Sequence, residues 1–395
     1  MNRIFLKATM VCVSPIAVGS GKSEYTDSDV LVDSEGRPFI PGTTIAGVCR
    51  HYLEDQGENV SDLFGSDRNE KSDSKIIFYE AFPKSETVIG QRDGVAISYD
   101  TETAKDGALF NYEIVGEGSS EGSSKFDLRI ELNDDENNNG KEYIKKIVNG
   151  FNNGFIRIGF KTNRGFGRVR LNQCKLAEIT DINELINFSW DKVTEDFEAN
   201  DDSDSKYETH SYNLTLKSFL MISDNSTLEE KDGELINAAQ LENTSGKPVI
   251  PGTVWSGIFR HYCYKVLLEI YKDQDHSQEI AKKKAEEIFG NTENASKIIF
   301  DESVILDGAP MCITRNAIDR FTGGACDKKL FTNRPVFGGT TTLNVIIKNT
   351  LRSEMKNLAL NLLELFIKEI NDGFVNIGSM GSVGGGIFKV EGCES

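Results

Sequence analysis

The sequence is poor in the residues that most often build metal centres. Its seven cysteines include no C-x-x-C pair, and only four histidines occur among 395 residues. These spacings do not match the common zinc motifs, so we expect no structural zinc. Reduced, unpaired thiols are typical of a cytoplasmic protein, which is the localisation that we predict.

Positive charge and long apolar runs are also scarce. The chain has 44 Lys and Arg against 62 Asp and Glu, a net charge of −18, which argues against a broad polyanion-binding surface. Much of the acid lies in two stretches that are typical of solvated loops, residues 133–140 and 194–208, so local basic loops remain possible. No apolar run is long enough to cross a bilayer, and we expect no membrane partner.

One fifteen-residue motif occurs twice in the sequence. Residues 38–52 and 248–262 share nine of fifteen positions, including the run Ile-Pro-Gly-Thr and the ending Arg-His-Tyr. Three further matches follow in the same order: Leu-Phe-Gly with Ile-Phe-Gly, Ser-Lys-Ile-Ile-Phe with itself, and residues 151–159 with 370–378. The chain is therefore predicted to be a tandem repeat: a first domain over residues 1–198, an acidic linker over 199–206 and a second domain over 207–395.

Each repeat shows the same alternation of strands and helices. A strand leads into the Ile-Pro-Gly-Thr helix, where Ile45, Cys49 and Tyr52 recur at a spacing that forms one apolar face. Strand-rich sequence follows, then a second helix, a further strand, a glycine-rich loop and a last strand. This β-α-β-β-α-β order predicts an α+β protein of two ferredoxin-like, RRM-like domains.

Together the repeated motifs resemble the RAMP superfamily, the ferredoxin-like subunits of CRISPR effector complexes. The Ile-Pro-Gly-Thr helix, the Ser-Lys-Ile-Ile-Phe element and the loop Arg-Gly-Phe-Gly-Arg-Val carry the likeness, which is closest to type III backbone subunits. Residues 92–113 and 315–331 resemble the β-hairpin, called the thumb, that these subunits insert across a guide–target duplex. Two fused repeats resemble the type III-D-like arrangement.

The resemblance implies a guide-directed, metal-dependent RNA endonuclease that works within a ribonucleoprotein. It implies as partners a guide CRISPR RNA, a complementary target RNA and other effector subunits, namely further RAMP subunits, a small subunit and a polymerase-like large subunit. Two alternatives stay open: a non-cleaving RNA-binding scaffold in the same complex, and an endonuclease that processes guide precursors.

The implied catalytic residue is Asp27, in the loop before Ile-Pro-Gly, with Asp29 and Asp33 as rivals. A carboxylate there could accept a proton or hold a divalent Mg or Mn ion, so Asp27 is also the predicted metal ligand. A plain surface aspartate is the alternative. The same count in the second repeat reaches Asn237, which cannot act as a base, so we expect only the first repeat to cut.

RNA contacts are expected at the helix starts and the glycine-rich loops, where backbone amides and cations can meet phosphates. The alternatives are ordinary helix caps and tight turns. The predicted RNA-binding residues are Gly21, Lys22, Thr43, Thr44, Arg50, Arg92, Lys161, Arg164, Gly165, Gly167, Arg168, Thr253, Arg260, Arg315, Gly384 and Gly385.

An aromatic wedge is expected on each thumb. Phe110 and Phe331 occupy matching positions, with Tyr99 and Phe321 as rivals, and core aromatics of a long hairpin are the alternative.

Overall fold

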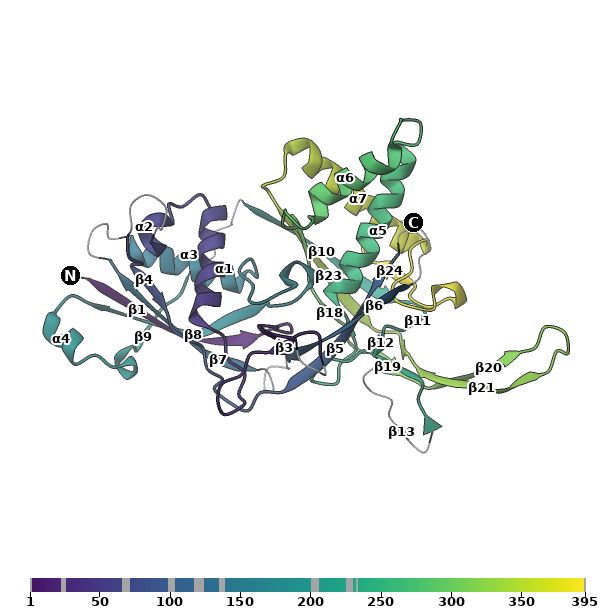
Figure 1. Ribbon diagram of the computed structural model, residues 1–395, viewed down its shortest axis with the longest axis horizontal. Helices are drawn as coiled ribbons and strands as arrows, with labels where there is room; N and C mark the ends of the chain where they lie inside the picture. The colour runs from purple at the N-terminus through teal and green to yellow at the C-terminus, as the bar shows by residue number, and fades with distance from the viewer. Residues whose placement is uncertain are drawn as a thin grey trace. The chain divides into compact units, whose positions relative to one another are not determined.

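The computed structural model describes residues 2–22, 26–65, 72–98, 104–116, 124–134, 139–199, 206–224, 230–231 and 234–393 (Figure 1). The chain forms two compact units. The first comprises residues 1–90, 112–162 and 166–207; the second comprises 91–111, 163–165 and 208–395. The units therefore differ from the two sequence repeats, because two short pieces of the first repeat belong to the second unit.

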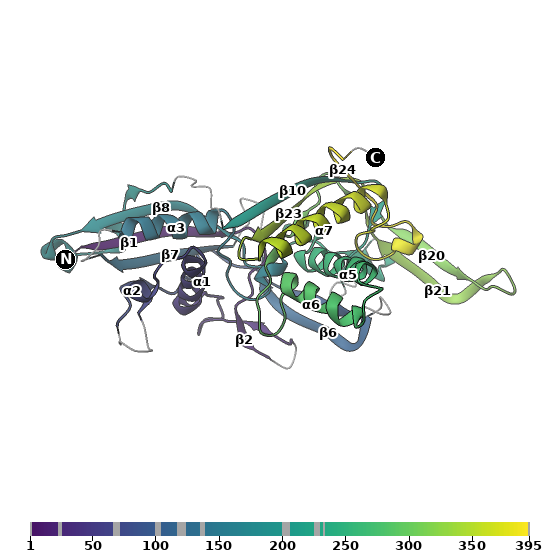
Figure 2. The ribbon, with the colours of Figure 1, turned by 90° about the horizontal axis from the view of Figure 1, so that it is seen from above.

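The first unit is built on a five-stranded antiparallel sheet in the order β4-β7-β1-β8-β9. Its strands are β1 (Arg3–Cys12), β4 (Ile76–Phe78), β7 (Lys125–Asn133), β8 (Val169–Ile179) and β9 (Glu195–Asp196). The helices are α1 (Gly42–Asp55), α2 (Ser61–Phe64), α3 (Gly140–Asn152) and α4 (Ile182–Ile186), with the 3-10 turn η2 (Trp190–Lys192). The 3-10 turn η1 (Thr162–Arg164) has only its first residue in this unit. Figure 2 shows α1 and α3 beside this sheet.

Close packing at the helix start explains why the Ile-Pro-Gly-Thr motif is repeated. Helix α1 begins at Gly42, where a Cβ atom would lie 2.1 Å from the backbone oxygen of Phe78. In the second unit a Cβ at Gly252 would lie 2.5 Å from the oxygen of Phe300. Only glycine lets each helix start press against the strand of the Ser-Lys-Ile-Ile-Phe element, so the two motifs are repeated together.

Aromatic side chains from residues 182–193 pack against the sheet of the first unit. Phe5 of β1 stacks on Phe188 at a centroid distance of 3.9 Å and meets Trp190 edge-on at 5.7 Å. Ile179 and Val193 complete this small buried cluster. An RRM-like domain reads RNA with aromatics exposed on its sheet, but these rings are packed against one another.

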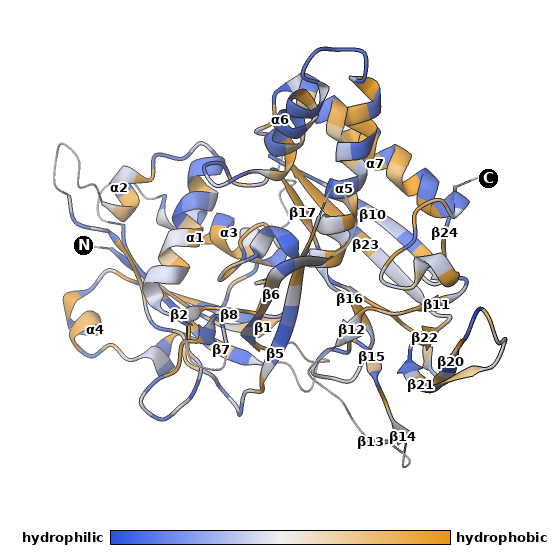
Figure 3. Cartoon of the chain, turned by 45° about the vertical axis from the view of Figure 1, so that its right-hand side comes forward, coloured by the Kyte–Doolittle hydropathy of each residue, from blue (hydrophilic) through white to orange (hydrophobic). Residues whose placement is uncertain are grey.

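The second unit repeats the plan with a sheet in the order β17-β23-β10-β24. These strands are β17 (Ile298–Phe300), β23 (Thr340–Lys348), β10 (Tyr207–Leu216) and β24 (Phe388–Val390). Its helices are α5 (Gly252–Ile270), α6 (Ser277–Phe289) and α7 (Ser353–Asp372), followed by the 3-10 turn η3 (Gly381–Val383). Hydrophobic and hydrophilic residues alternate along α5 and α7 (Figure 3), and the apolar ones enter one core with Trp255, Phe259 and Phe366.

The remaining strands form small sheets and hairpins. In the first repeat β2 (Gly19–Gly21) pairs with β3 (Asp29–Val30), and β5 (Ile89–Ile97) with β6 (Ala104–Val115). In the second, β20 (Ile313–Ile318) and β21 (Ala325–Arg334) form a hairpin that joins β12 (Ser223–Asp224) and β15 (Ala238–Gln240). The short strands are β11 (Phe219–Leu220), β13 (Glu230–Lys231), β14 (Glu234–Leu235), β16 (Val249–Ile250), β18 (Ser303–Val304), β19 (Ala309–Pro310) and β22 (Val336–Phe337).

The predicted mixed α+β class is confirmed. In the part of the chain that the structure describes, no helix is both long and apolar enough to cross a membrane.

Candidate nucleic-acid interface

The loop before α1 places the predicted catalytic aspartate in contact with a lysine. The Nζ atom of Lys22 donates to the Oδ1 atom of Asp27 at 2.7 Å, and both side chains are exposed. The hydrogen bond and charge of Asp27 raise the pKa of Lys22. The exposed Gly21 precedes this lysine in an extended left-handed conformation, with φ at 123°. A carboxylate and an ammonium group are therefore both open to a ligand.

The two rival aspartates have structural partners. Asp29 accepts a hydrogen bond from the hydroxyl of Thr26. Asp33 accepts from the backbone amides of Glu35 and Arg37, each at 2.9 Å, and pairs with the Arg37 guanidinium at 2.8 Å. These hydrogen bonds, led by the Arg37 amide, hold the pKa of Asp33 below its usual value.

Comparison with the second repeat shows which of these aspartate positions serves the fold. Asn243 accepts from the amides of Ser245 and Lys247 at 3.0 and 2.9 Å, so it closes the same turn as Asp33 without a charge. Asn237, at the position of Asp27, accepts from the amide of Thr332 at 2.7 Å. The position of Asp33 therefore needs a turn-forming side chain, whereas that of Asp27 differs in chemistry between the repeats. Asp232 and Glu234 could substitute for Asn237 if the register of this loop shifts, but Asp232 and the side chain of Glu234 lie outside the described part.

The helices α1 and α5 are not capped by threonine at their starts. The cap positions are Pro41 and Pro251, neither of which makes a side-chain capping bond. Thr43 is exposed, and Thr44 and Thr253 are half-buried. The threonines therefore do not act as N-caps, and their hydroxyl groups lie in the first turn.

The arginines farther along these helices have protein contacts. Arg50 pairs with Glu54 at 3.1 Å on the surface of α1. The guanidinium of Arg260 lies 5.9 Å from the ring centroid of Phe289. Both arginines are half-buried, so part of each side chain remains accessible.

The glycine-rich loop of the first repeat divides into packing and surface residues. Gly167 is buried, its amide donates to the oxygen of Pro15 at 2.8 Å, and a Cβ there would lie 2.1 Å from the oxygen of Ile158. Gly165 is also buried, whereas Arg164 is exposed and Arg168 is half-buried. The glycines allow close backbone packing, and the arginines are the groups that could meet phosphates.

The matching loop of the second repeat has a similar backbone conformation but lacks the basic side chains. Gly384 has φ at 86°, close to the 92° of its counterpart Gly165. The amide of Gly384 donates to the oxygen of Gly381, and the amide of Gly385 donates to the oxygen of Met380 at 3.0 Å. The loop is thus closed on itself and carries no basic residue.

Arg92 lies inside the protein. Its side chain and that of Glu302 are each 5% exposed, and they form a two-pronged ion pair within the second unit. Arg92 therefore does not present its guanidinium at the surface in this structure. Arg315, on β20, is half-buried with its guanidinium 5.6 Å from the ring centroid of Phe219.

The hairpins differ in how they expose aromatic rings. Phe110 is half-buried, and a Cβ at Gly94 would meet its ring. Phe331 is 41% exposed, but Phe321 is 97% exposed, in a turn that Asp319 holds through the amides of Phe321 and Thr322. Tyr99 lies outside the described residues. Phe321 is thus the ring most available for stacking.

Asp27 does not belong to a preformed metal cage. Within the described residues, no three His, Cys, Asp or Glu side chains are arranged to hold a metal ion. Magnesium is often bound through one or two carboxylates together with substrate phosphates. The Asp27 carboxylate therefore fits Mg or Mn only if RNA supplies other ligands.

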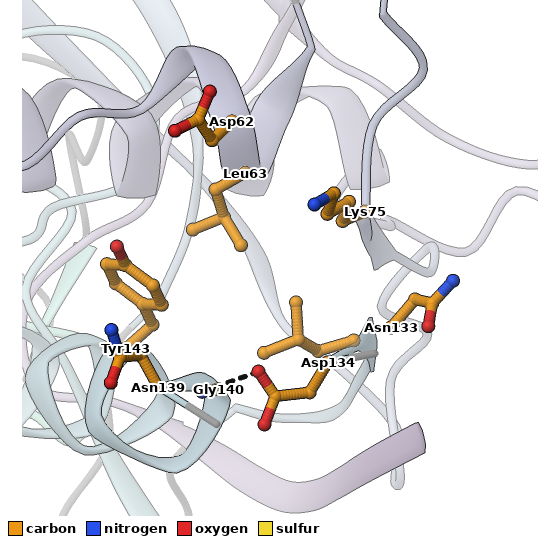
Figure 4. Close-up of a pocket in the computed structure, with 9 residues that line it drawn as sticks. Asp62, Leu63, Lys75, Asn133, Asp134, Asn139, Gly140 and Tyr143 are labelled. Atoms are coloured by element: carbon orange, nitrogen blue, oxygen red, sulfur yellow. Dashed lines mark hydrogen bonds between the residues drawn. The ribbon is translucent and has the colours of Figure 1, made fainter. Parts of the chain in front are cut away.

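A small pocket of about 60 Å³ lies elsewhere in the first unit (Figure 4). Asp62, Leu63, Lys75 and Tyr143 line it, and the carboxylate of Asp134 accepts from the amide of Gly140 at 3.0 Å. None of the predicted RNA-binding residues lines this pocket, and its volume is far below that of a small-molecule site.

Two residues that contact predicted RNA-binding residues were not identified from the sequence. Tyr112 carries Lys161 on its ring, with the Nζ atom 3.4 Å from the centroid, and Glu302 neutralises Arg92. Both belong to contacts between residues far apart in the chain. Comparing the two repeats position by position could have drawn attention to Tyr112, because the second repeat has Asn333 there.

Comparison with known proteins agrees with the repeat. No curated protein matches the chain. The family model of the RAMP superfamily matches twice, over residues 9–170 and 213–389. Membership of this family implies a CRISPR-associated RNA-binding subunit, and the two matches coincide with the two repeats. The chain therefore belongs to the RAMP superfamily.

Proposed function

We propose that the protein is a guide-RNA-binding backbone subunit of a type III-like CRISPR ribonucleoprotein, of the fused, III-D-like arrangement. Each repeat would be a ferredoxin-like domain, which the strand orders β4-β7-β1-β8 and β17-β23-β10-β24 support. The β5–β6 and β20–β21 hairpins would be its thumbs. Further RAMP subunits, a small subunit and a polymerase-like large subunit would complete the complex.

The proposal extends to cleavage of the target RNA by the first repeat. The observation that carries it is the contrast between Asp27, an exposed carboxylate beside Lys22, and Asn237, an amide bonded to the hairpin backbone. Only the first of these groups can take a proton from a 2′-hydroxyl. The second repeat would bind RNA without cutting it.

The chemistry would be an internal transesterification. The 2′-oxygen attacks the adjacent phosphorus, the bond from phosphorus to O2′ forms, and the bond from phosphorus to O5′ breaks. The 2′-hydroxyl proton passes to Asp27, and the departing 5′-oxygen takes a proton from water. A bound Mg or Mn ion would neutralise phosphate charge. The products are a 2′,3′-cyclic phosphate and a 5′-hydroxyl end.

The contribution of the protein would be mainly positional. A thumb aromatic that flips out a base lets the neighbouring ribose bring its 2′-oxygen into line with the phosphate, and holding this geometry lowers the barrier. Phe321 is the exposed ring suited to this role in the second repeat.

The test is single-turnover cleavage of a labelled complementary RNA by the guide-loaded complex, with Mg or Mn and with EDTA. Asp27→Asn, which installs the residue of the second repeat, should abolish cutting and leave the Kd for the target unchanged. Asp33→Asn is the matched control and should cut like the wild type. Cutting that survives Asp27→Asn would favour the scaffold role, with catalysis elsewhere. Cutting of the guide precursor instead of the target would favour the processing enzyme.

A further inference from the structure

Lys161 is held in an unusual position. Its backbone has φ at 54°, in the left-handed region that side chains other than glycine rarely adopt. Its Nζ atom lies 3.4 Å from the ring centroid of Tyr112 and 5.5 Å from that of Phe160. Backbone strain of this kind is found often at functional sites. The loop thus fixes an ammonium group over a buried ring.

The same tyrosine is joined to the segment that carries Asp27. Ser28, the next residue, forms a parallel bridge with Tyr112. On either side, the amide of Glu113 donates to the oxygen of Ser28 at 2.9 Å, and the Glu113 carboxylate accepts from the amide of Val30 at 3.0 Å. Strand β6 therefore connects the Asp27 segment to the ring under Lys161, within the first unit.

The second repeat keeps this backbone arrangement but has other side chains. Ala238 pairs in parallel with Asn333, as Ser28 does with Tyr112. Met380 has φ at 67°, like Lys161, and its sulfur lies 4.0 Å from the Asn333 amide nitrogen. Asn237, Asn333 and Met380 thus replace Asp27, Tyr112 and Lys161. The second repeat therefore lacks the carboxylate, the aromatic ring and the ammonium group together, although it keeps the parallel pairing and the positive φ.

We propose that Lys161 is a catalytic residue of the first repeat that contacts the phosphate on which Asp27 acts, and that Tyr112 is its positioning residue. This inference rests on the proposed function. An ammonium group is a compact charge with three donors, suited to a phosphate oxygen whose negative charge grows during attack. The cation–π contact keeps the lysine in place before RNA arrives.

The inference is tested by the single-turnover rate at saturating target RNA, measured beside the Kd. Lys161→Met, which installs the residue of the second repeat, should lower the rate by about 100- to 1,000-fold, as removal of one stabilising donor does, and change the Kd far less. Tyr112→Leu removes the ring under Lys161 and should lower the rate in the same way, and Tyr112→Phe, which keeps a ring at this position, should recover the rate that Tyr112→Leu loses. An effect of Lys161→Met on the Kd alone would show an ordinary phosphate contact and overturn the proposal.

The converse experiment introduces the carboxylate, the aromatic ring and the ammonium group into the second repeat. The triple variant Asn237→Asp, Asn333→Tyr, Met380→Lys should cut the target at a second position at least about tenfold faster than Asn237→Asp alone. Equal rates at that position would contradict the inference. If the wild type does not cut at all, the proposed function and this inference both fail. If the wild type cuts and Lys161→Met cuts equally fast, only the inference fails.

Discussion

Arg92 and Glu302 form a buried ion pair although they belong to different sequence repeats. Two nitrogens of the guanidinium reach the two carboxylate oxygens, one of them at 3.1 Å, and both side chains are 5% exposed. The β5–β6 hairpin that carries Arg92 is a piece of the first repeat, yet its residues 91–111 are part of the second compact unit. This pair therefore contributes to the fold of that unit.

Loss of Arg92 should destabilise the second unit strongly. Arg92→Met leaves the Glu302 carboxylate buried without its partner, which costs about 3–5 kcal/mol of unfolding free energy. Denaturant unfolding measures this change. Lys175→Met is the matched control, because its partner Asp196 has a side chain that is 82% exposed, and its cost should stay below about 1 kcal/mol. Equal effects of the two variants would contradict the buried role.

Adding a methyl group at the repeated glycine should also destabilise the fold. Gly42→Ala places a Cβ atom 2.1 Å from the Phe78 oxygen, so the helix must shift, at a cost of about 1–3 kcal/mol in unfolding free energy. Gly47→Ala, in the same helix, meets nothing within 4 Å and should raise stability by about 0.5–1 kcal/mol. Thermal melts of both variants check the prediction, and melting shifts of the same sign would refute it.

Asp33 should act as a turn residue with a depressed pKa. Since its pKa is lower in the folded protein, its ionised form contributes stability above the unfolded pKa of about 3.9, and this contribution is lost as pH falls through the folded pKa. An NMR titration of the carboxyl carbon measures the shift. Asp33→Asn should keep the turn, as Asn243 does, and should remove this pH dependence, whereas Asp33→Ala should break the turn. A carboxyl that titrates at or above about 3.9 would rule the assignment out.

Phe321 should serve RNA binding and not stability. It is 97% exposed, so Phe321→Ala should change the unfolding free energy by less than about 0.5 kcal/mol. Loss of one stacked base costs about 1–3 kcal/mol, which raises the Kd for RNA by roughly 5- to 150-fold. Phe374→Ala, at a 79% exposed site of the same unit, is the control and should leave the Kd unchanged. Comparable losses of affinity in the two variants would indicate a non-specific apolar effect.

Local and periodic features of this protein could be predicted from its sequence. The tandem repeat, the helices that follow Ile-Pro-Gly-Thr and their buried faces depend on patterns within a few residues, and these appear at Ile45, Cys49 and Tyr52 in the first unit. The difference between Asp27 and Asn237 was also visible, because a constant offset of 210 residues relates the two loops.

The tertiary structure decided which of the predicted site residues are accessible. The sequence predicted RNA contacts for both Arg92 and Arg164. In the structure Arg92 is buried against a glutamate 210 positions away, whereas Arg164 is exposed. Lys161 lies on a tyrosine from another strand. The sequence determined the repeated elements, because their patterns follow helix and strand periods. Only packing determined which core the β5–β6 hairpin joins, since that depends on shape and charge contributed by distant residues.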